Sequence, residues 1–452
     1  MDLSCFKAYD LRGRVPDQLN PKLAELIGRA YVAITGARKV IVGYDIRLSS
    51  PEIAGALSSG LMAAGADVFD IGLCGTEQVY FATSHYRMDG GIMVTASHNP
   101  RDHNGMKLVG PESRPISSDN GLNAIRDRVL EPFADAPSQG RFEPLEIEAA
   151  YIDHLLGYID PSSLKPMKIV VNAGNGGAGV VVDALEPHLP FSFERVHHEA
   201  DGNFPNGVPN PIVEENRAVT SQAVIASGAA MGIAWDGDYD RCFFFDENGR
   251  FIEGYYIVGL LADQFLRKAG GGKIIHDPRL TWNTLDLVKA AGGEAIESKT
   301  GHAFIKQRMR DEDALYGGEM SAHHYFRDFA YCDSGMIPWL LVAERLCQSG
   351  QTLSSLIDAR IEAYPASGEI NRTIQDPPAV ISAIEKRYGP EAISVSHVDG
   401  VSIEYADWRF NLRMSNTEPV VRLNVESRGD IPLMKRKTQE LLEEMERLDR
   451  AG

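Results

Sequence analysis

Three stretches of this 452-residue chain repeat one pattern, and that repeat constrains the fold more than any other feature. Each stretch begins with an apolar run of strand length, at residues 39–45, 168–174 and 273–277. A helix-length segment, a glycine-containing turn and a second short strand follow each run, at residues 67–70, 193–196 and 294–297. Continuous apolar strands that alternate with helices are typical of parallel sheets, so we expect three βαβ units.

Each repeat then reaches a third apolar strand that runs into a polar loop. The three loops are Thr95-Ala96-Ser97-His98-Asn99-Pro100, Asp236-Gly237-Asp238-Tyr239-Asp240-Arg241 and Gly318-Glu319-Met320-Ser321-Ala322-His323-His324. Ligands of open α/β sheets bind at the carboxyl ends of the strands. If the three domains pack around one cleft, we expect the loops to converge there.

The pattern changes beyond residue 364. Residues 401–405 and 421–425 alternate with period two, and residues 431–448 place apolar side chains at helical spacing. We therefore predict an α/β protein with three related α/β domains plus a smaller C-terminal α+β domain around a central cleft. The expected boundaries are 1–140, 141–248, 249–364 and 365–452.

Composition narrows the range of partners. Acidic residues outnumber basic ones 63 to 45, giving a formal charge of −18, so we expect no nucleic acid and no membrane as partner. The five cysteines are scattered without a CxxC pair, which makes zinc and a disulfide framework improbable. The first residues lack a signal-peptide core and no apolar run reaches a membrane-spanning length, so we expect a cytoplasmic protein.

The first polar loop offers a candidate nucleophile. Asn99-Pro100 predicts a turn, which leaves Ser97 at the end of a strand. A hydroxyl there can carry a phosphoryl group when a base, cations and a metal lie nearby. Lys107 can serve as a charge clamp or a base, while His98 and His323 are alternative proton carriers.

Other basic residues could assist the serine. Tyr9-Asp10-Leu11-Arg12-Gly13 places Arg12 in a predicted loop, from which it could contact a phosphate on the serine. In the last domain, Arg413-Met414-Ser415-Asn416-Thr417-Glu418-Pro419 and the nearby Arg422 combine hydroxyls, an amide and loop backbone between arginines. This is the composition of an anion-binding nest, and a phosphate is its natural ligand.

The second polar loop predicts a metal site. Asp236, Asp238 and Asp240 alternate in what we expect to be an extended loop, so their carboxylates can converge on one cation. A set of oxygen ligands favours magnesium (Mg2+) over zinc. Arg241 can either bind a phosphate or pair with one of the aspartates. The same loop also allows an aspartyl-phosphate phosphatase, with Asp236 as nucleophile.

With these motifs assembled, the chain resembles the α-D-phosphohexomutase family, and within it the bacterial phosphomannomutases. The resemblance covers all four loops in order: the phosphoserine loop at 95–100, the magnesium loop at 236–241, the sugar-hydroxyl loop at 318–323 and the phosphate-binding loop at 413–419. Tyr9 and Arg12 match an N-terminal element, and Lys107 matches the lysine of an Asn-Gly-x-Lys element. Tyr239 departs from the pattern, because a glycine is common there.

The resemblance implies an enzyme that interconverts mannose 6-phosphate and mannose 1-phosphate for GDP-mannose synthesis. Phosphorylated Ser97 would donate its phosphoryl group and recover another from a hexose 1,6-bisphosphate, which also serves as activator. Ser97 and the three aspartates would hold magnesium, and His98, Lys107, Arg12, Arg241 and His323 would assist catalysis. The implied substrate-binding residues are Tyr9, Arg279, Lys299, Glu319, Ser321, Arg413, Ser415, Asn416, Thr417 and Arg422.

Several alternatives stay open. Within the family they are a dual phosphomannomutase/phosphoglucomutase and a phosphoglucosamine mutase. Outside it they are the aspartyl-phosphate sugar phosphatase and a catalytically silent sugar-phosphate sensor. We expect a monomer or a homodimer.

Overall fold

The computed structural model describes residues 2–414 and 420–451. They form two compact units, and each is described by itself. The first unit comprises residues 1–251 and 323–350, and the second comprises residues 252–322 and 351–452. Among the described residues, no helix combines the length and apolar character that crossing a bilayer requires.

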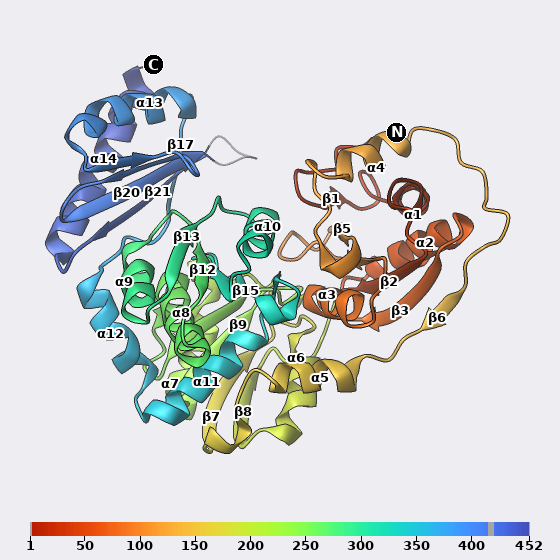
Figure 1. The fold of residues 1–452 in the computed structure, drawn as a ribbon, viewed down its shortest axis with the longest axis horizontal. Coiled ribbons are helices and arrows are strands. Elements are labelled where there is room, and N and C mark those ends of the chain that lie inside the picture. Colours follow the sequence, from red (N-terminus) through yellow and green to blue (C-terminus); the bar gives the residue numbers. More distant parts are fainter. Residues whose placement is uncertain (1, 415–419, 452) are drawn as a thin grey trace. The chain divides into compact units, whose positions relative to one another are not determined.

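The first sheet of the first unit has the strand order β1-β5-β4-β2-β3-β6 (Figure 1). Its strands are β1 (Leu11–Arg14), β2 (Lys39–Tyr44), β3 (Asp67–Leu73), β4 (Gly90–Val94), β5 (His103–Val109) and β6 (Phe142–Pro144). The helices are α1 (Pro21–Thr35), α2 (Ser50–Ala63), α3 (Thr76–His85) and α4 (Leu122–Arg128), with a 3-10 turn η1 (Pro111–Ser113). The strands β2, β3 and β4 run parallel, as expected from the repeat.

Helices cover both faces of this sheet. Apolar residues of α1, α2 and α4 form one core with β2, β4 and β5. On the other face, α3 packs closely against the glycines of the strands. A Cβ at Gly43 or at Gly91 would lie 3.0 Å from the side chain of Val79, which belongs to α3. We expected the first domain to end at residue 140, whereas β6 adds residues 142–144 to its sheet, because their backbone pairs with the edge strand β3.

The second sheet has the order β11-β10-β9-β7-β8. Its strands are β7 (Met167–Asn172), β8 (Phe191–Val196), β9 (Met231–Trp235), β10 (Cys242–Asp246) and β11 (Phe251–Ile252), the last at the junction of the two units. The helices and turns around it are α5 (Glu148–Leu156), η2 (Pro161–Ser163), α6 (Ala178–Leu185), η3 (Glu186–His188), η4 (Glu214–Asn216) and α7 (Ala218–Ser227). Strand β7 lies parallel to and between β8 and β9.

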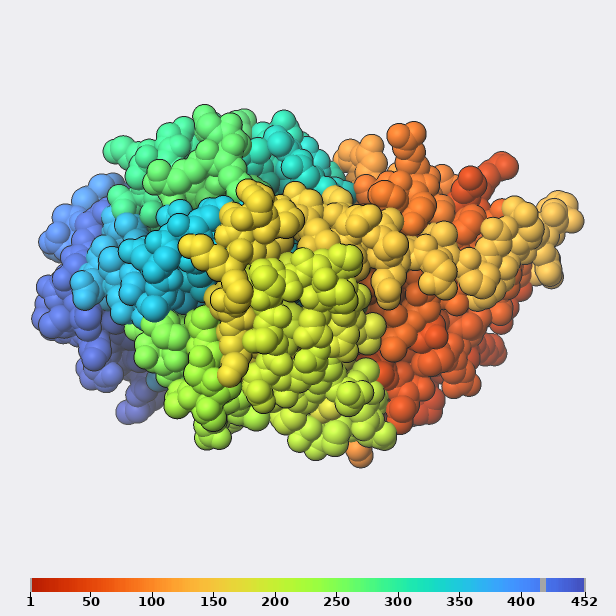
Figure 2. All heavy atoms as spheres, turned by 90° about the horizontal axis from the view of Figure 1, so that it is seen from below, coloured from red at the N-terminus to blue at the C-terminus, as the bar shows by residue number. Residues whose placement is uncertain are grey.

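Residues 323–350 complete the first unit with β15 (His324–Phe326), η5 (Arg327–Phe329), β16 (Cys332–Asp333) and α11 (Ile337–Ser349). Helix α11 lies against the chain around η2, which Figure 2 shows as yellow spheres beside blue-cyan ones. The backbone amide of Asp160 donates to Glu344 over 2.7 Å there. This hydrogen bond attaches α11 to the chain between α5 and β7.

The second unit contains a parallel group and an antiparallel sheet. In the first, β12 (Lys273–His276) pairs with β13 (Glu294–Glu297) and β14 (Tyr316–Gly318), among α8 (Gly254–Ala269), α9 (Trp282–Ala290), α10 (His302–Glu312) and α12 (Leu353–Ala363). The second has the order β17-β21-β20-β19-β18. It consists of β17 (Ile370–Thr373), β18 (Ser394–Ser396), β19 (Val401–Glu404), β20 (Trp408–Met414) and β21 (Val420–Ser427), with α13 (Pro377–Tyr388), η6 (Gly389–Glu391) and α14 (Ile431–Ala451).

The three repeats therefore share one topology. The first strand lies in the middle, the second strand pairs on one side of it and the third pairs on the other. Such a change of direction leaves a crevice at the carboxyl ends of the first and third strands. The three polar loops of the sequence follow the third strands β4, β9 and β14, so each begins at such a crevice.

Candidate active site

Ser97 lies three residues beyond β4, in a strained backbone conformation. Its φ of +49° is left-handed, a region that costs a residue other than glycine on the order of 1 kcal/mol or more. The Thr95 hydroxyl accepts a hydrogen bond from the Ser97 amide over 2.8 Å. The surrounding loop thus holds the serine in a geometry that it would not adopt by itself.

The Ser97 side chain meets the aspartate loop of the second sheet. Ser97 Oγ donates to Asp236 Oδ2 over 2.8 Å and lies 3.1 Å from His98 Nδ1. Arg241 Nη2 lies 2.7 Å from both Asp236 Oδ2 and His98 Nδ1, so Arg241 pairs with an aspartate, one of its two expected roles. Partial burial, followed by the charge of Arg241, lowers the pKa of His98 well below its usual range.

The three aspartates converge as predicted, but by a different backbone route. We expected an extended loop, whereas residues 237 and 238 form a turn and Tyr239 has a left-handed φ of +43°. That conformation accounts for the glycine common at this position in the family, because glycine adopts it without strain. Tyr239 is held there by its ring contacts and by its hydroxyl, which donates to Gln78.

This aspartate cluster has the properties of a divalent-cation site. Asp236, Asp238 and Asp240 are buried, and one carboxylate oxygen of each lies within 4.8 Å of the others. The Oδ1 atoms of Asp238 and Asp240 are buried without a hydrogen-bond partner among the described residues. Buried carboxylate oxygens need a proton or a cation, and a set of oxygens suits Mg2+. The residues present therefore fit the ion that the resemblance implies.

Lys107, on β5, neutralises part of this cluster. Its Nζ lies 2.7 Å from Asp238 Oδ2 and 2.5 Å from Asp240 Oδ2. Burial alone would lower the pKa of Lys107, but the two carboxylates outweigh it and raise that pKa above its ordinary value. Lys107 thus pairs with two carboxylates at once, which is the arrangement of a charge clamp.

His323 reaches the same region from the chain before β15. Its Nδ1 lies 3.0 Å from Oδ2 of the buried Asp333, and both residues are within 4.8 Å of an Asp240 oxygen through their nearest ligand atoms. A carboxylate hydrogen-bonded to one ring nitrogen fixes the orientation of the imidazole. Of the three predicted proton carriers, His323 has the geometry of an oriented base.

Arg12 corrects another local expectation. We expected it in a loop, but it lies in β1, where alternating residues 11–14 pair with β5. Its Nη1 donates to Asn99 Oδ1 over 2.8 Å, and its Nε donates to Asp10. The side chain therefore reaches the serine loop, although from a strand. Tyr9 is half-buried two residues before that strand.

The second unit brings together the predicted sugar-binding residues. Arg279 Nη2 lies 3.3 Å from Ser321 Oγ and 3.7 Å from Glu319 Oε1. Glu319 also accepts from the Gly301 amide over 3.0 Å. Lys299 lies near this group in sequence, with its Nζ 4.8 Å from the centre of the Phe304 ring.

The predicted phosphate-binding arginines surround one carboxylate. Glu369 Oε2 is 3.0 Å from Arg413 and 3.4 Å from Arg279, and Glu369 Oε1 is 3.4 Å from Arg422. Three guanidinium groups around one carboxylate make a site that is ready for an anion. Ser415, Asn416 and Thr417 lie outside the described residues.

The sequence reading missed several residues that bond to those predicted, among them Arg47, Thr76, Asp333 and Glu369. Thr76 donates to Asp238 Oδ2 over 2.6 Å. Of these residues, only Arg47 could have been found from the sequence, because Asp45-Ile46-Arg47 and Asp277-Pro278-Arg279 stand at the same place in two repeats. The other three lie far in sequence from the residues they contact.

Four domain families match the chain in order. They are the phosphoglucomutase/phosphomannomutase alpha/beta/alpha domains I, II and III, at residues 4–134, 149–249 and 253–364, and the C-terminal domain of the same proteins, at residues 369–444. The chain thus belongs to the α-D-phosphohexomutase family, and three α/β domains plus a C-terminal domain are its fold, as predicted.

The relatives make the relationship more specific. The chain is 59% identical over 442 residues to the phosphohexose mutases of Xanthomonas campestris pv. campestris strain B100, covering 98% of this chain and 99% of the relative. It is 58% identical over 449 residues to the phosphomannomutase of Escherichia coli K12, covering 97% and 98%. A crystal structure of a phosphoglucomutase/phosphomannomutase family protein from Burkholderia thailandensis has a TM-score of 0.89 at 32% identity, covering 99% and 98%.

Proposed function

We propose that this protein is a phosphomannomutase, an isomerase that interconverts mannose 6-phosphate and mannose 1-phosphate through a phosphoserine at Ser97. The observation that carries the proposal is the contact between Ser97 Oγ and the aspartate cluster, with Arg241 and Lys107 beside it. The names of relatives 53–59% identical over nearly the whole chain support mannose phosphates as substrates.

In the first half-reaction, the phosphoryl group leaves Ser97 Oγ for a free hydroxyl of the sugar phosphate. The P–O bond to Oγ breaks and leaves its electron pair on Oγ, which takes up a proton. A P–O bond to the sugar oxygen forms, and the hydroxyl proton of the sugar passes to a base. His323, held by Asp333, is the base that the geometry favours. Catalysis of this kind needs positioning and charge neutralisation, which Arg12, Arg241 and Lys107 supply.

In the second half-reaction, the sugar bisphosphate returns its other phosphoryl group to Ser97. The Oγ proton then has two acceptors within reach, Asp236 Oδ2 at 2.8 Å and His98 Nδ1 at 3.1 Å. Arg241 contacts both acceptors. A hexose 1,6-bisphosphate would serve as activator, since it can rephosphorylate an empty Ser97.

Asp236, Asp238, Asp240 and Ser97 would hold Mg2+, which when bound neutralises charge on the phosphoryl oxygens. In the second unit, Glu319 and Ser321 would bind sugar hydroxyls with Arg279, while Arg413, Arg422 and Lys299 would bind the phosphate that is not transferred. Ser415, Asn416, Thr417 and Tyr9 complete the proposed set.

The alternatives differ in what they require. An aspartyl-phosphate phosphatase needs Asp236 as nucleophile, but its Oδ2 already accepts from Ser97 and Arg241, which argues against this role. A silent sensor has no need of the oriented His323–Asp333 pair. A dual phosphomannomutase/phosphoglucomutase and a phosphoglucosamine mutase remain alternatives for the same site, because Glu319 and Ser321 would contact the 3- and 4-hydroxyls, which mannose, glucose and glucosamine share.

We further propose a cytoplasmic protein that acts as a monomer or a homodimer, with domains at 1–140, 141–248, 249–364 and 365–452, the first of them extended by the strand β6. The family matches begin and end within a few residues of most of these boundaries.

The test is a comparison of kcat/KM for mannose 1-phosphate, glucose 1-phosphate and glucosamine 1-phosphate at one activator concentration. We expect kcat/KM to be highest for mannose 1-phosphate. We also expect the enzyme to lose its turnover of this substrate after exhaustive chelation and to regain it with Mg2+. Turnover of glucosamine phosphate above that of mannose phosphate would contradict the substrate assignment, and full activity after chelation would contradict the metal site.

A further inference from the structure

The first strands of the three repeats end in the same turn. In each turn, a polar residue at the end of the strand accepts a hydrogen bond, through its side-chain oxygen, from the backbone amide of the residue two positions later. Arg47 N donates to Asp45 Oδ1 over 3.0 Å, Gly174 N to Asn172 Oδ1 over 2.9 Å, and Arg279 N to Asp277 Oδ1 over 2.9 Å. The turns are structural equivalents, but the residue at their end differs. It is an arginine in the first and third repeats and a glycine in the second.

In the first repeat, Arg47 spans the crevice to the serine loop. Its side chain is 1% exposed. The hydrogen bonds of its terminal nitrogens go to backbone carbonyls of that loop and of the first residue of β5: Pro100 at 2.7 Å, His103 at 2.9 Å, Ser97 at 2.9 Å and Asn99 at 2.6 Å. One guanidinium group therefore ties together the backbone from residue 97 to residue 103.

Asp45 holds the same loop from the other side. It accepts from the Thr95 hydroxyl over 2.7 Å, and Thr95 in turn accepts from the Ser97 amide. Arg47 Nε lies 3.3 Å from Asp45 Oδ2, so the two residues form one unit. The amide of Ser97 is thus held through Asp45, and its carbonyl is held directly by Arg47. These contacts bracket the residue that has the strained φ.

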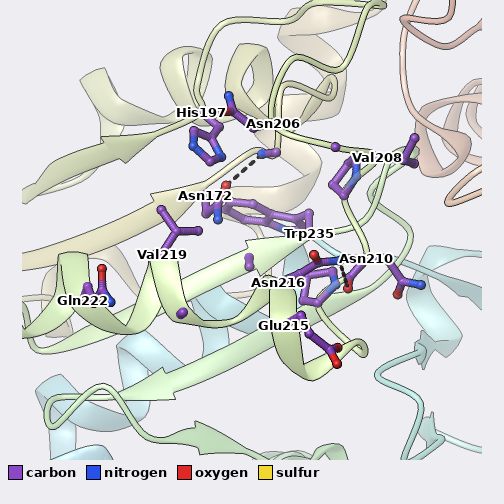
Figure 3. Close-up of a pocket in the computed structure, with 16 residues that line it drawn as sticks. Asn172, His197, Asn206, Val208, Asn210, Glu215, Asn216, Val219, Gln222 and Trp235 are labelled. Atoms are coloured by element: carbon purple, nitrogen blue, oxygen red, sulfur yellow. Dashed lines mark hydrogen bonds between the residues drawn. The ribbon is translucent and has the colours of Figure 1, made fainter.

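The other repeats show what the arginine adds. In the third, Arg279 spans the equivalent crevice to Ser321 and Glu319 of the loop after β14. In the second, Gly174 has a φ of +58°, and a Cβ there would lie 2.3 Å from the Pro209 side chain. The crevice beside it stays open as a cavity of about 370 Å³, lined by Asn172 and Trp235 at the ends of β7 and β9 (Figure 3). The turn and the sheet therefore form without an arginine.

We propose that Arg47 is a positioning residue for phosphoryl transfer: it holds the Ser97–His103 backbone so that Ser97 Oγ stays at the aspartate cluster in both half-reactions. The proposal rests on the proposed function, because it assigns the serine as the group that gives and takes the phosphoryl. Arg47 touches no reacting atom. It acts through four carbonyls, a pattern that only a guanidinium fork can provide.

The experiment compares Arg47→Met and Arg47→Lys with the wild type and with Arg217→Met. Arg217 is a matched control, because it also donates to loop carbonyls, those of Pro211 and Ile212, but far from the serine loop in sequence. For each protein, kcat and KM for mannose 1-phosphate, the melting temperature and hydrogen exchange of peptides that cover residues 97–104 are measured.

For Arg47→Met we expect kcat to fall about 10²-fold, the usual cost of a small misplacement of a reacting group, with KM within about twofold of the wild type. Exchange at residues 97–104 becomes faster. Arg47→Lys gives an intermediate kcat, and Arg217→Met keeps the wild-type kcat and the wild-type exchange in this loop.

Wild-type kcat and wild-type loop exchange in a folded Arg47→Lys would overturn the proposal, as would an equal loss of kcat in Arg217→Met. If Arg47→Met does not fold, kcat and loop exchange of Arg47→Lys decide between the proposal and its rejection. A wild type without mutase turnover would contradict the proposed function, while the loop exchange would still report whether Arg47 orders residues 97–103.

Discussion

Lys107 and Asp238 form a buried ion pair, with Nζ 2.7 Å from Oδ2, inside the cluster of carboxylates that fits a divalent cation. The same Nζ contacts Asp240. The ammonium group of Lys107 therefore neutralises part of the negative charge that would bind a cation. A positive charge at this distance weakens the binding of a second cation, because their repulsion is screened little in a buried site.

Lys107→Met is expected to bind Mg2+ more tightly than the wild type, by about tenfold or more in Kd, which corresponds to about 1.4 kcal/mol. Its turnover should nevertheless be much lower, because the charge clamp on the phosphoryl group is gone. Isothermal titration with Mg2+ and a mutase assay measure the two effects. Unchanged or weaker Mg2+ binding in this variant would show that the lysine and the cation do not compete.

Glu369 competes with phosphate in the second unit. Its carboxylate contacts Arg279, Arg413 and Arg422, and their charges outweigh burial and lower its pKa. Glu369→Gln removes the negative charge and leaves the three arginines, so we expect KM for mannose 1-phosphate to fall several-fold and the melting temperature to drop. A rise in KM would mean that the carboxylate orients the arginines more than it opposes the substrate.

The control for that measurement is Glu391→Gln in the same domain. Glu391 is exposed in η6, away from the arginine cluster in sequence. We expect it to leave both KM and the melting temperature unchanged, because isolated surface charges contribute little.

Glu77 joins three parts of the first unit. It lies in α3 and accepts hydrogen bonds from the Tyr151 hydroxyl, the Ser334 hydroxyl and the Gly335 and Met336 amides, all of them buried. Glu77→Gln replaces one carboxylate oxygen, an acceptor, with an amide nitrogen, a donor that faces these groups. We expect a loss of about 2 kcal/mol or more of unfolding free energy, because unpaired buried donors keep their full desolvation cost.

Chemical denaturation of Glu77→Gln beside Glu52→Gln measures this loss. Glu52 is exposed on α2, and its variant should match the wild type. Equal stability of all three proteins would show that the four hydrogen bonds contribute nothing in net terms.

The sequence predicted the repeat well because buried parallel strands carry a continuous apolar signal. The nine strands of the three βαβ units appear where the apolar runs lie, within three residues at their ends. The polar loops were also predictable, since the carboxyl end of a strand is where α/β sheets place function. Ser97, Asp236 and Lys107 meet accordingly.

The rest depends on contacts that no local pattern encodes. Arg12 reads as a loop residue because β1 is short and gains its strand geometry only by pairing with β5. The turn at Tyr239 depends on the space that Gly75 and Gly177 leave for its ring. Asp333 and Glu369 are ordinary acidic residues in sequence, and their roles come from partners 10 to 90 positions away.

The central claim is that Ser97 carries the transferred phosphoryl group, and one measurement tests it directly. Protein phosphorylated with hexose 1,6-bisphosphate labelled in its phosphates is freed of ligand, mixed with unlabelled mannose 1-phosphate and quenched. Mass spectrometry then follows the phosphopeptide that contains Ser97. The account predicts that the label starts on Ser97, leaves it within one turnover and appears in the sugar phosphates, and that Ser97→Ala, though folded, neither takes up label nor turns over. Label on Asp236 instead, or turnover by Ser97→Ala free of host enzyme, would contradict it.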